Sequence, residues 1–364
     1  MAPVVLGMQA QRKNFRPVVC VTGQHREMLR QMLDTFGIKP DRDLAVMQPN
    51  QSLAAMTTRI LHNVEGVIAQ EKPSLLVVQG DTTTSFVAAL AAFYQRVPVA
   101  HIEAGLRTGD FENPFPEELN RTLIDRFATF CFAPTDLNRR TLLAEGIAPK
   151  RIFVTGNTGI DALLMIRNRV RRKPSTTWDN LWGSAKLAVH ERSRELILIT
   201  AHRRESFGPW MRAMFTVIRN LARKHPEREF VYPVHLNPNV RRPARQILTG
   251  LHNVHLIEPL PYEPFVFLMD RASVILTDSG GIQEEAPSLG KPVVVMRKTT
   301  ERIEAIKAGT VTLAGNTGQG MGGTIERMMG PAGGRPSRIW KNPYGDGRAA
   351  QKILKILGHA FGSR

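Results

Sequence analysis

One stretch of the chain carries a complete strand–turn–helix–strand pattern, and it constrains the fold more than any other. Residues 273–277 are apolar and largely β-branched, and short enough for a buried parallel strand. A Ser-Gly-Gly turn at 279–281 follows, and a helix is predicted from about Ile282. Gly-Lys-Pro at 290–292 ends that helix before a second apolar strand at 293–296. The pattern predicts a βαβ unit and therefore an α/β protein with parallel strands.

The Ser-Gly-Gly turn also predicts an anion site. Unpaired backbone N–H groups and the positive end of a helix favour a phosphate at this point. Glu285 falls inside the first helical turn, where its carboxylate could face a ligand held by the turn. The alternative is an ordinary strand–helix connection in which glycine only makes the turn tight. The stretch by itself leaves both interpretations open.

Alternating strand and helix signals occur in two sets, and 364 residues suffice for two hydrophobic cores. The first set of predicted strands is 17–22, 44–47, 74–78, 97–102, 129–132 and 152–155. The second set is 196–200, 229–234, 254–257, 273–277 and 292–296. The predicted divisions are an N-terminal domain at 1–166, a basic linker at 167–193, a C-terminal domain at 194–341 and a final segment with a helix at 342–364. We expect two doubly wound, Rossmann-like domains, with ligands beyond the carboxyl ends of the strands in a cleft between them.

The formal net charge of +17 raises the question of a nucleic-acid partner. Part of the excess is a basic run before Pro174 that consists of Arg167, Arg169, Arg171, Arg172 and Lys173. No aromatic interleaving and no recognition-helix pattern accompany this run, so we interpret it as a solvated face of the linker. Nucleic acid is therefore not a predicted partner.

The sequence indicates neither a membrane span nor export. No run reaches the about 18 apolar residues of a membrane span, and no apolar signal core precedes a small-residue cleavage site. Cys20 and Cys131 both stand inside apolar runs and are predicted to be buried, reduced residues without metal-ligand spacing. We predict a cytoplasmic protein that does not associate with a membrane and holds no metal.

Three carboxylates, Asp81, Glu103 and Glu117, follow predicted strands or open the next helix in the first half. Acid–base steps on a sugar require at least two such groups in different environments. Asp81 could instead cap the following helix, and the helix dipole alone would explain the pair Glu117 and Glu118. Glu103 comes directly after a buried strand, where an uncompensated charge is costly, and this favours a functional role.

Cationic groups follow strands in the second half. His202 and Arg203 open a His-Arg-Arg run after residues 196–200, which suits a diphosphate or a developing anion; structural ion pairing is the alternative. His235 follows the next strand and would by itself be taken as structural. Glu301 and Arg302 follow the strand after the glycine turn and could close on a ribose or a sugar.

Seven motifs together resemble those of one known family. They are Gln-Gly-Asp-Thr-Thr-Thr at 79–84, His-Ile-Glu-Ala-Gly-Leu-Arg-Thr-Gly at 101–109, Pro-Glu-Glu-Leu-Asn-Arg at 116–121, Ala-His-Arg-Arg-Glu-Ser at 201–206, Tyr-Pro-Val-His-Leu-Asn-Pro-Asn at 232–239, Asp-Ser-Gly-Gly-Ile-Gln-Glu-Glu-Ala-Pro at 278–287 and Asn-Pro-Tyr-Gly-Asp-Gly at 342–347. In this combination the chain resembles the non-hydrolysing UDP-N-acetylglucosamine 2-epimerases over nearly its whole length.

The resemblance implies the two-domain glycosyltransferase-B architecture, with the final helix returning to the first domain. It implies reversible epimerisation at C2 of UDP-N-acetylglucosamine to UDP-N-acetylmannosamine. UDP is eliminated to leave 2-acetamidoglucal and is then added back, without a metal or a nicotinamide cofactor. It further implies a homodimer, a possible second UDP-N-acetylglucosamine bound as activator, and a product used for cell-surface polysaccharide.

The resemblance also implies roles for individual residues. Asp81, Glu103 and Glu117 match the acid–base carboxylates, and His202 matches the histidine that meets the phosphates or the leaving group. The matched substrate-binding residues are Leu260, Phe265, Ser279, Gly280, Gly281, Glu285 and Arg302. Of these, the glycine turn would hold the diphosphate, Glu285 the ribose and Phe265 the uracil. The residues that match activator-binding positions are Gln24, Arg59, Arg203, Glu205 and His235.

The sequence departs from the family pattern at its start. Family chains begin with a strand and a Gly-Thr-Arg-Pro-Glu loop, whereas Met1 here matches the segment after that loop. We hypothesise a start codon assigned too late or a decaying gene, and we expect the strands beside the missing one to lack a partner or to pair across the gap. The alternatives to the epimerase are a UDP-sugar glycosyltransferase of the same fold and an inactive nucleotide-sugar-binding chain.

Overall fold

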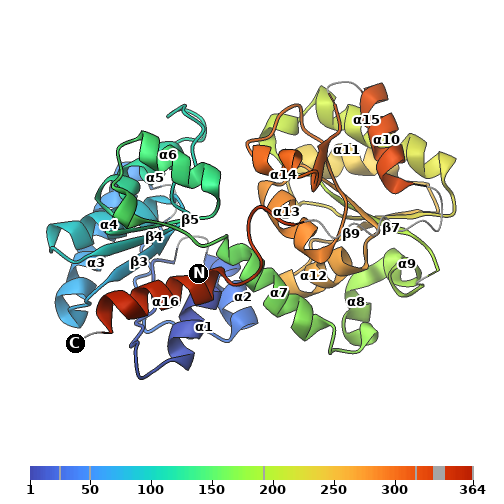
Figure 1. Cartoon of the computed structure of the whole chain (residues 1–364). Helices are drawn as coiled ribbons and strands as arrows, with labels where there is room; N and C mark the ends of the chain where they lie inside the picture. The colour runs from blue at the N-terminus through green and yellow to red at the C-terminus, as the bar shows by residue number, and fades with distance from the viewer. Residues whose placement is uncertain (24–25, 49–50, 192, 316–317, 331–340, 363–364) are drawn as a thin grey trace. The chain divides into compact units, whose positions relative to one another are not determined.

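A computed structural model describes residues 1–23, 26–48, 51–191, 193–315, 318–330 and 341–362 (Figure 1). The chain forms two compact units. Unit 1 comprises Met1–Ala162 and Tyr344–Arg364, and unit 2 comprises Leu163–Pro343. The segment predicted as a linker, 167–193, is thus part of unit 2. Each unit contains a parallel sheet covered by helices, which is the fold class predicted from the sequence.

The main sheet of unit 1 has four parallel strands in the order β3-β4-β5-β6. These strands are β3 (Leu76–Gln79), β4 (Val99–Ile102), β5 (Phe130–Ala133) and β6 (Ile152–Val154). The helices of this unit include α1 (Ala2–Ala10), α2 (Arg26–Phe36), α3 (Leu53–Glu71), α4 (Thr83–Tyr94), α5 (Glu117–Phe127), α6 (Asp136–Ala144) and α16 (Ala349–Phe361). Helix α7 (Thr158–Val170) runs from unit 1 into unit 2.

Side-chain alternation along β4 divides the two faces of this sheet. Ala100 and Ile102 pack with residues of α1 and α16, which lie side by side in Figure 1. Val99 packs on the opposite face with residues of α3, α4 and α5. His101 stands between Ala100 and Ile102 in β4, so its side chain points to the opposite face from theirs, which is the face covered by α5.

Helix α3 shows why the local sequence folds as it does. Ser52 caps its N-terminus by accepting the N–H of Ala55, and Lys72 ends it in a left-handed conformation with φ of 45°. Its core stripe recurs every four residues and consists of Met56, Ile60, Val64 and Ile68. Burial of each such side chain contributes about 1.5–3 kcal/mol relative to exposure.

A separate two-stranded parallel sheet, β1 (Cys20–Val21) with β2 (Arg42–Asp43), completes unit 1. The strand predicted at 17–22 is therefore shorter than expected, and the strand predicted at 44–47 is wrong. Ala45 there adopts a left-handed φ of 45°, which no regular strand accommodates. Cys20 is exposed rather than buried, because β1 has a strand neighbour on one side only; Cys131 is buried as predicted.

Within the described residues β1 pairs with β2 only, and β3 is one of the two edge strands of the main sheet, so no strand pairing joins the two sheets there. A side-chain contact joins Thr22, after β1, to Thr84 at the start of α4, with 3.1 Å between their hydroxyl oxygens.

Unit 2 is built on a six-stranded parallel sheet in the order β12-β11-β10-β7-β8-β9. Its strands are β7 (Leu196–Thr200), β8 (Glu229–Pro233), β9 (Val254–Ile257), β10 (Val274–Thr277), β11 (Val293–Val295) and β12 (Val311–Leu313). Its helices include α8 (Asp179–Trp182), α9 (Lys186–His190), α10 (Pro209–Lys224), α11 (Pro238–Leu248), α12 (Tyr262–Arg271), α13 (Gly280–Glu285), α14 (Ile303–Lys307) and α15 (Gly318–Met329). Strand β12 and helix α15 lie outside the elements predicted from the sequence.

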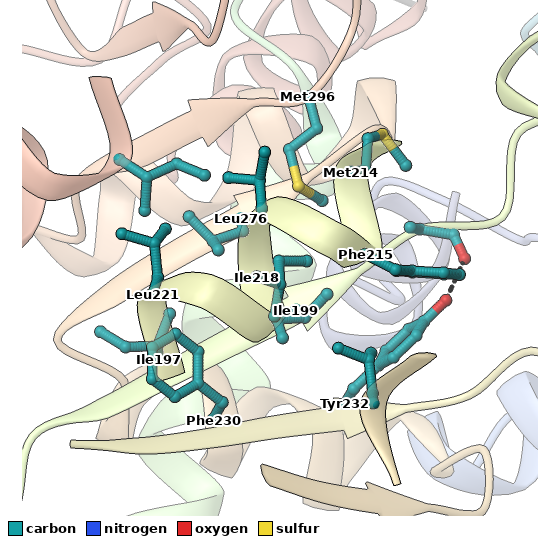
Figure 2. Close-up of a cluster of buried hydrophobic side chains, with 14 of the residues drawn as sticks. Ile197, Ile199, Met214, Phe215, Ile218, Leu221, Phe230, Tyr232, Leu276 and Met296 are labelled. Carbon is teal, nitrogen blue, oxygen red and sulfur yellow. Dashed lines mark hydrogen bonds between the residues drawn. The ribbon is translucent and has the colours of Figure 1, made fainter. Parts of the chain in front are cut away.

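The core of unit 2 explains the nearly unbroken apolar runs of its central strands. All residues of β7 and β10 are buried, as expected for parallel strands covered on both faces. Figure 2 shows one face, where Ile199 of β7 and Leu276 of β10 meet Phe215 and Ile218 of α10. Tyr232 is buried in the same cluster, and its hydroxyl donates a hydrogen bond of 2.6 Å to the Ala201 carbonyl, so burial leaves no orphaned polar group.

The basic run at 167–173 is not simply a solvated face. Arg169 and Lys173 both pair with Glu263 of α12, and Arg171 forms a two-bond ion pair of 2.8 Å with Asp270 of the same helix. Phe267, which lies between Glu263 and Asp270 in the sequence, packs against two tryptophans. Its ring centroid is 5.4 Å from that of Trp178 and 5.8 Å from that of Trp182. The basic run therefore holds the segment that contains it against α12.

The last helix belongs to unit 1. Asp161 accepts the N–H groups of Ala349 and Ala350 at 3.1 and 2.8 Å, which satisfies the start of α16. Leu354 of α16 lies over Gly7 of α1, where an added Cβ would come within 2.4 Å of it. Among the described helices, none has the length and apolar character needed to cross a membrane.

Candidate active site

Asp81 and Glu103 follow adjacent strands, β3 and β4, at the carboxyl edge of the unit 1 sheet. Thr82, not Asp81, caps α4, because the Thr82 side chain accepts the N–H of Ser85. The capping alternative for Asp81 is therefore wrong. Its carboxylate instead pairs with Arg121 of α5, with 2.9 Å between Oδ2 and Nη2. Asp81 remains partly exposed and available to a ligand.

Glu103 is held by two neutral amides. Its Oε2 accepts from Gln79 Nε2 at 3.1 Å, and its Oε1 accepts from Asn157 Nδ2 at 3.3 Å. The residue has φ of 69°, in the left-handed region that side chains other than glycine rarely adopt. Backbone strain of this kind gathers at functional sites. Glu103 is thus fixed in position by amides, and no ion pair to its carboxylate is found among the described residues.

Glu117 and Glu118 open α5 but differ in surroundings. Glu118 is buried, and its carboxylate accepts the N–H groups of Thr108 and Gly109 at about 3 Å. Glu117 is partly exposed, and no side-chain hydrogen bond to its carboxylate is found in the described part of the chain. The helix dipole acts on both residues, so it cannot account for this difference. The free carboxylate is the one that the family resemblance assigned to catalysis.

His202 follows β7 in unit 2 and lies next to the buried Asp278, which follows β10. Asp278 accepts the backbone N–H groups of His202 and Arg203 at 2.9 Å. The His202 ring stacks on His235, with centroids 5.6 Å apart. Burial lowers the pKa of His202, with a further lowering from His235 and Arg203, against an opposing attraction by Asp278. His202 is therefore largely neutral at neutral pH and can accept or share a proton near a phosphate.

Gly280, the first residue of α13, lies under two guanidinium groups. A Cβ added there would come within 3.0 Å of Arg302 Cζ and within 3.2 Å of Arg203 Nη2. Ser279 precedes the helix, and its side chain makes no capping hydrogen bond. Glycine thus permits the arginines to approach the backbone at the position where the sequence predicted a phosphate.

The two arginines already have acidic partners. Arg302 pairs with Glu284 at 2.9 Å and with Glu301, and Arg203 lies 3.7 Å from Glu301. A diphosphate could replace these carboxylates, since arginine forms similar two-bond contacts with both groups. Glu301 and Arg302 thus form an ion pair, and their closing on a ribose or a sugar stays a prediction.

The surroundings of Glu285 disfavour the ionised form of its carboxyl group. Burial, and then the neighbouring Glu284, raise the pKa of Glu285 to about 8. A carboxyl group in this state donates a hydrogen bond in the unbound protein and can ionise when hydroxyl donors reach it. Tyr262 of α12 lies nearby. Burial raises the pKa of the Tyr262 hydroxyl, and the charge of Glu285 raises it further.

The remaining predicted nucleotide contacts flank α12. Leu260 is partly buried in the connection between β9 and α12, and Phe265 is partly buried on α12 itself. Both belong to unit 2, as do the glycine turn and Arg302. Nothing in their own contacts distinguishes a uracil site from ordinary packing.

The residues matched to activator positions divide between the units. Arg203, Glu205 and His235 join the His202 and Gly280 region, and Glu205 pairs with Arg297 at 2.6 Å. Arg59 lies on α3 of unit 1 and donates to the Val46 carbonyl at 3.2 Å. Gln24 lies outside the described residues.

Three charged residues at the site escaped the sequence analysis. Asp278 is buried directly after β10, the same signal that singled out Glu103. Arg121 contacts Asp81 and also lies 3.5 Å from Glu118, and Asp125 is a buried residue of the same helix as Arg121. Only Asp278 carried a readable signal; α5 has an ordinary charged-helix pattern. In the described residues no group of three or more His, Cys, Asp or Glu side chains could hold a metal ion.

Comparison with known proteins identifies the family. Residues 8–358 match the family described as UDP-N-acetylglucosamine 2-epimerase. A UDP-N-acetylglucosamine 2-epimerase of Yersinia pestis is 51% identical over 98% of this chain and 94% of its own length. The crystal structure of the enzyme from Neisseria meningitidis, bound to UDP-GlcNAc, superposes with a TM-score of 0.86 at 46% identity, covering 98% of this chain and 95% of that one.

A more distant match extends the fold alone. A glycosyltransferase from Rickettsia africae has a TM-score of 0.63 at 12% identity, covering all of this chain and 95% of its own. The α/β architecture in two units is therefore shared with glycosyltransferases, as predicted. The full-length matches confirm the resemblance seen in the seven motifs, and the chain belongs to the UDP-N-acetylglucosamine 2-epimerase family, a family of isomerases.

Proposed function

We propose that this chain interconverts UDP-N-acetylglucosamine and UDP-N-acetylmannosamine by eliminating UDP and adding it back. A carboxylate takes the proton from C2 while the bond from C1 to the β-phosphate oxygen breaks and its electrons leave with UDP. The product of this step is 2-acetamidoglucal, with a double bond between C1 and C2. Return of a proton to the opposite face of C2, with re-addition of UDP at C1, completes the inversion.

One observation carries this proposal. Unit 1 presents three carboxylates, Asp81, Glu103 and Glu117, with three different kinds of partner: an arginine, two amides, and none within the described residues. Inversion at C2 requires one group to remove a proton and another to deliver one from the other side. A pair of carboxylates in different environments can divide these roles, and a transferase with a single base would not need three.

Unit 2 would hold the nucleotide and stabilise the leaving group. Negative charge develops on the β-phosphate as the C1–O bond breaks, and preorganised donors lower the barrier for this step. The N–H groups at Gly280 and Gly281, the guanidinium groups of Arg203 and Arg302, and His202 are the donors that we assign. Glu285 would accept the ribose hydroxyls, and Phe265 and Leu260 would contact the uracil.

The finer assignments of assembly and regulation follow from the same family. We propose a cytoplasmic homodimer that binds a second UDP-N-acetylglucosamine as activator and uses no cofactor. The position of Arg203, Glu205 and His235 beside His202 supports a link between activator binding and the nucleotide region of unit 2. The product would enter the synthesis of a surface polysaccharide.

The decisive experiment is incubation of the purified chain with UDP-N-acetylglucosamine, followed by proton NMR of the sugar anomers. Appearance of UDP-N-acetylmannosamine, with deuterium at C2 when the solvent is D₂O, is the expected result. Release of UDP without that product would indicate hydrolysis or transfer. Binding without turnover would indicate an inactive nucleotide-sugar-binding chain.

A further inference from the structure

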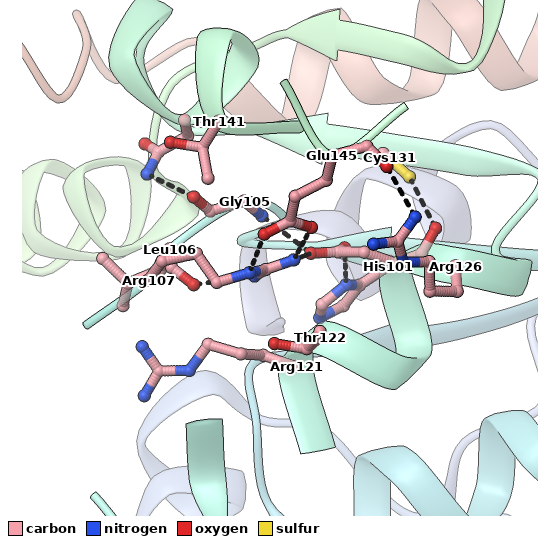
Figure 3. A network of polar contacts seen from close by, with 12 residues as sticks. His101, Gly105, Leu106, Arg107, Arg121, Thr122, Arg126, Cys131, Thr141 and Glu145 are labelled. Carbon is pink, nitrogen blue, oxygen red and sulfur yellow. Dashed lines mark hydrogen bonds and ion pairs between the residues drawn. The ribbon is translucent and has the colours of Figure 1, made fainter. Parts of the chain in front are cut away.

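His101 is completely buried, and both of its ring nitrogens face oxygen acceptors. Figure 3 shows His101 in one polar network with Arg107 and Glu145. Nδ1 lies 2.6 Å from Oδ1 of Asp125, and Nε2 lies 2.9 Å from the carbonyl oxygen of Gly80. A carbonyl oxygen only accepts hydrogen bonds, so Nε2 must carry a proton. Whether Nδ1 also carries a proton then depends on whether Asp125 is ionised.

Asp125 has the partners of an ionised carboxylate. Its Oδ2 accepts from the Gly105 N–H at 3.1 Å and from Arg107 Nη2 at 2.8 Å. Arg107 in turn forms a two-bond pair with Glu145, at 2.8 and 2.9 Å. Burial alone would raise the pKa of Asp125, but attraction and hydrogen bonding by His101 and Arg107 bring it below its usual value. With Asp125 ionised, Nδ1 of His101 carries a proton as well.

We propose that His101 is a permanently charged imidazolium that acts as a positioning residue for the three proposed acid–base carboxylates of unit 1. The row His101, Asp125, Arg107 and Glu145 alternates in charge and sums to zero. This arrangement compensates the burial of each ion, which would be costly alone. The proposal rests on the epimerase function assigned above, because that function defines the carboxylates that need positioning.

The row reaches all three segments that carry those carboxylates. Gly80 is bound on both sides: its N–H donates to the Ile102 carbonyl at 3.0 Å and its carbonyl accepts from His101, which fixes the backbone directly before Asp81. Asp125 binds the Gly105 N–H two residues after Glu103. Asp125 also belongs to α5, whose first residue is Glu117.

The charged form is consistent with every group that faces the ring. Burial on its own lowers the pKa of His101, but the attraction and hydrogen bond of Asp125, the Gly80 carbonyl and the charge of Glu103 together raise it above its usual value. The helix α5 contributes Asp125, the turn after β3 contributes Gly80, and Glu103 lies on the same chain segment as His101. Two arginines contact Asp125: the guanidinium of Arg107 is bound to the carboxylates of Asp125 and Glu145, and Arg151 donates to the Asp125 backbone carbonyl at 3.1 Å.

The first test measures the protonation state directly. Two-dimensional ¹H–¹⁵N NMR of the ring should show both His101 nitrogens protonated between about pH 6 and pH 9, the range in which free histidine loses its charge. The Asp125→Asn variant is the matched change, because its amide can donate to Nδ1 while Nε2 still donates to Gly80. In that variant His101 should become neutral. A single protonated nitrogen in the parent protein at pH 7 would overturn the proposal.

The second test separates positioning from simple stabilisation. Asp125→Asn should lower kcat by about 10-fold to 100-fold with KM changed by less than about 3-fold, the scale on which a misplaced catalytic group reduces rate. Asp125→Asn removes the Asp125 anion and, with it, the charge of His101. Because His101 is the member of this pair that interacts with the charge of Glu103, the acidic limb of the kcat–pH profile should also move to higher pH. The control is His255→Gln, which breaks a buried pair of 2.7 Å with Glu229 in unit 2. Unfolding temperatures of both variants are measured alongside.

Equal losses of unfolding temperature in both variants, with an altered pH profile only in Asp125→Asn, would support the positioning role. An unchanged profile and kcat in Asp125→Asn would overturn it. The NMR result does not depend on turnover, and amide exchange at Gly80 and Gly105 should accelerate in Asp125→Asn but not in His255→Gln. If the epimerase assignment is wrong, the parent protein will form no UDP-N-acetylmannosamine. The NMR of the His101 ring and the amide exchange at Gly80 and Gly105 would still determine whether His101 is charged.

Discussion

The polar region of unit 1 and that of unit 2 solve different physical problems. In unit 1 the row of alternating charges from His101 to Glu145 is fully buried at His101 and Asp125, and we propose that it fixes the backbone around Asp81 and Glu103. In unit 2 the guanidinium groups over Gly280 pair with carboxylates, and we propose that a bound anion replaces these carboxylates. Proton transfer depends on fixed geometry, whereas binding and release of a nucleotide depend on exchange of partners. The two regions should therefore fail in different kinetic parameters.

The largest effect is expected from the carboxylates of unit 1. Asp81→Asn, Glu103→Gln and Glu117→Gln should each lower kcat by about 100-fold or more, the scale of general acid–base catalysis, with small changes in KM. Steady-state kinetics with UDP-N-acetylglucosamine measures this. Glu112→Gln, in the exposed loop before α5, is the matched control and should keep the parent rate. Near-normal rates in all three variants would remove the chemistry from unit 1.

A smaller effect is expected from Gly280→Ala in unit 2. The added methyl group would press on Arg302 and Arg203 at 3.0 and 3.2 Å and displace their guanidinium groups by a few tenths of an ångström. We expect UDP affinity, measured by calorimetry, to fall by about 3-fold to 10-fold with kcat less affected. Gly323→Ala, where no atom lies within 4 Å of the added carbon, should bind UDP normally. A fall in kcat without weaker binding would contradict the contrast between the two units.

The protonation of Glu285 supplies a pH test of unit 2. Its folded pKa of about 8 is raised above the usual value, so the native state binds more protons than the unfolded state and loses stability as pH rises towards 8. UDP binding near pH 7 should release a proton if ribose hydroxyls donate to the carboxylate. Calorimetry in buffers of different ionisation enthalpy measures that release. Glu285→Gln should abolish both effects, and proton release that persists in this variant would assign it to another group.

The smallest effect is expected outside both regions. Arg171→Ala removes an ion pair with Asp270 on the surface of unit 2. Because the arginine is more than half exposed, the free energy of unfolding should fall by less than about 1 kcal/mol, and turnover should stay unchanged. Denaturant unfolding measures the first quantity. A loss of several kcal/mol would show that the basic run is a structural requirement of unit 2.

The sequence predicted elements whose cause is local. The β-branched run before the Ser-Gly-Gly turn, with a helix after it, is present as β10 and α13, and Gly290 ends the following turn in a left-handed conformation. Motif matches also drew attention to the carboxylates at the ends of β3 and β4. In these cases short-range patterning and the preferences of single residues decide the structure.

The features that the sequence did not reveal depend on tertiary neighbours. Cys20 looked buried because its neighbours in sequence are apolar, but a strand is buried only when strands or helices cover it. Glu117 and Glu118 are adjacent and have the same side chain. Only the position of the loop at Thr108 determines that Glu118 is the one that accepts backbone hydrogen bonds. His101 and Asp125 are 24 residues apart, so no local pattern could reveal their pair.

The left-handed backbone of Glu103 has a consequence for how this position responds to change. An L-residue with a side chain costs about 1 kcal/mol or more in that conformation, whereas glycine adopts it freely. Glu103→Gly would therefore relax the main chain at the same time as it deletes the carboxylate. Under the proposed mechanism this one change would relieve the backbone and abolish turnover together, so selection for a relaxed main chain alone would discard the carboxylate that we propose for catalysis.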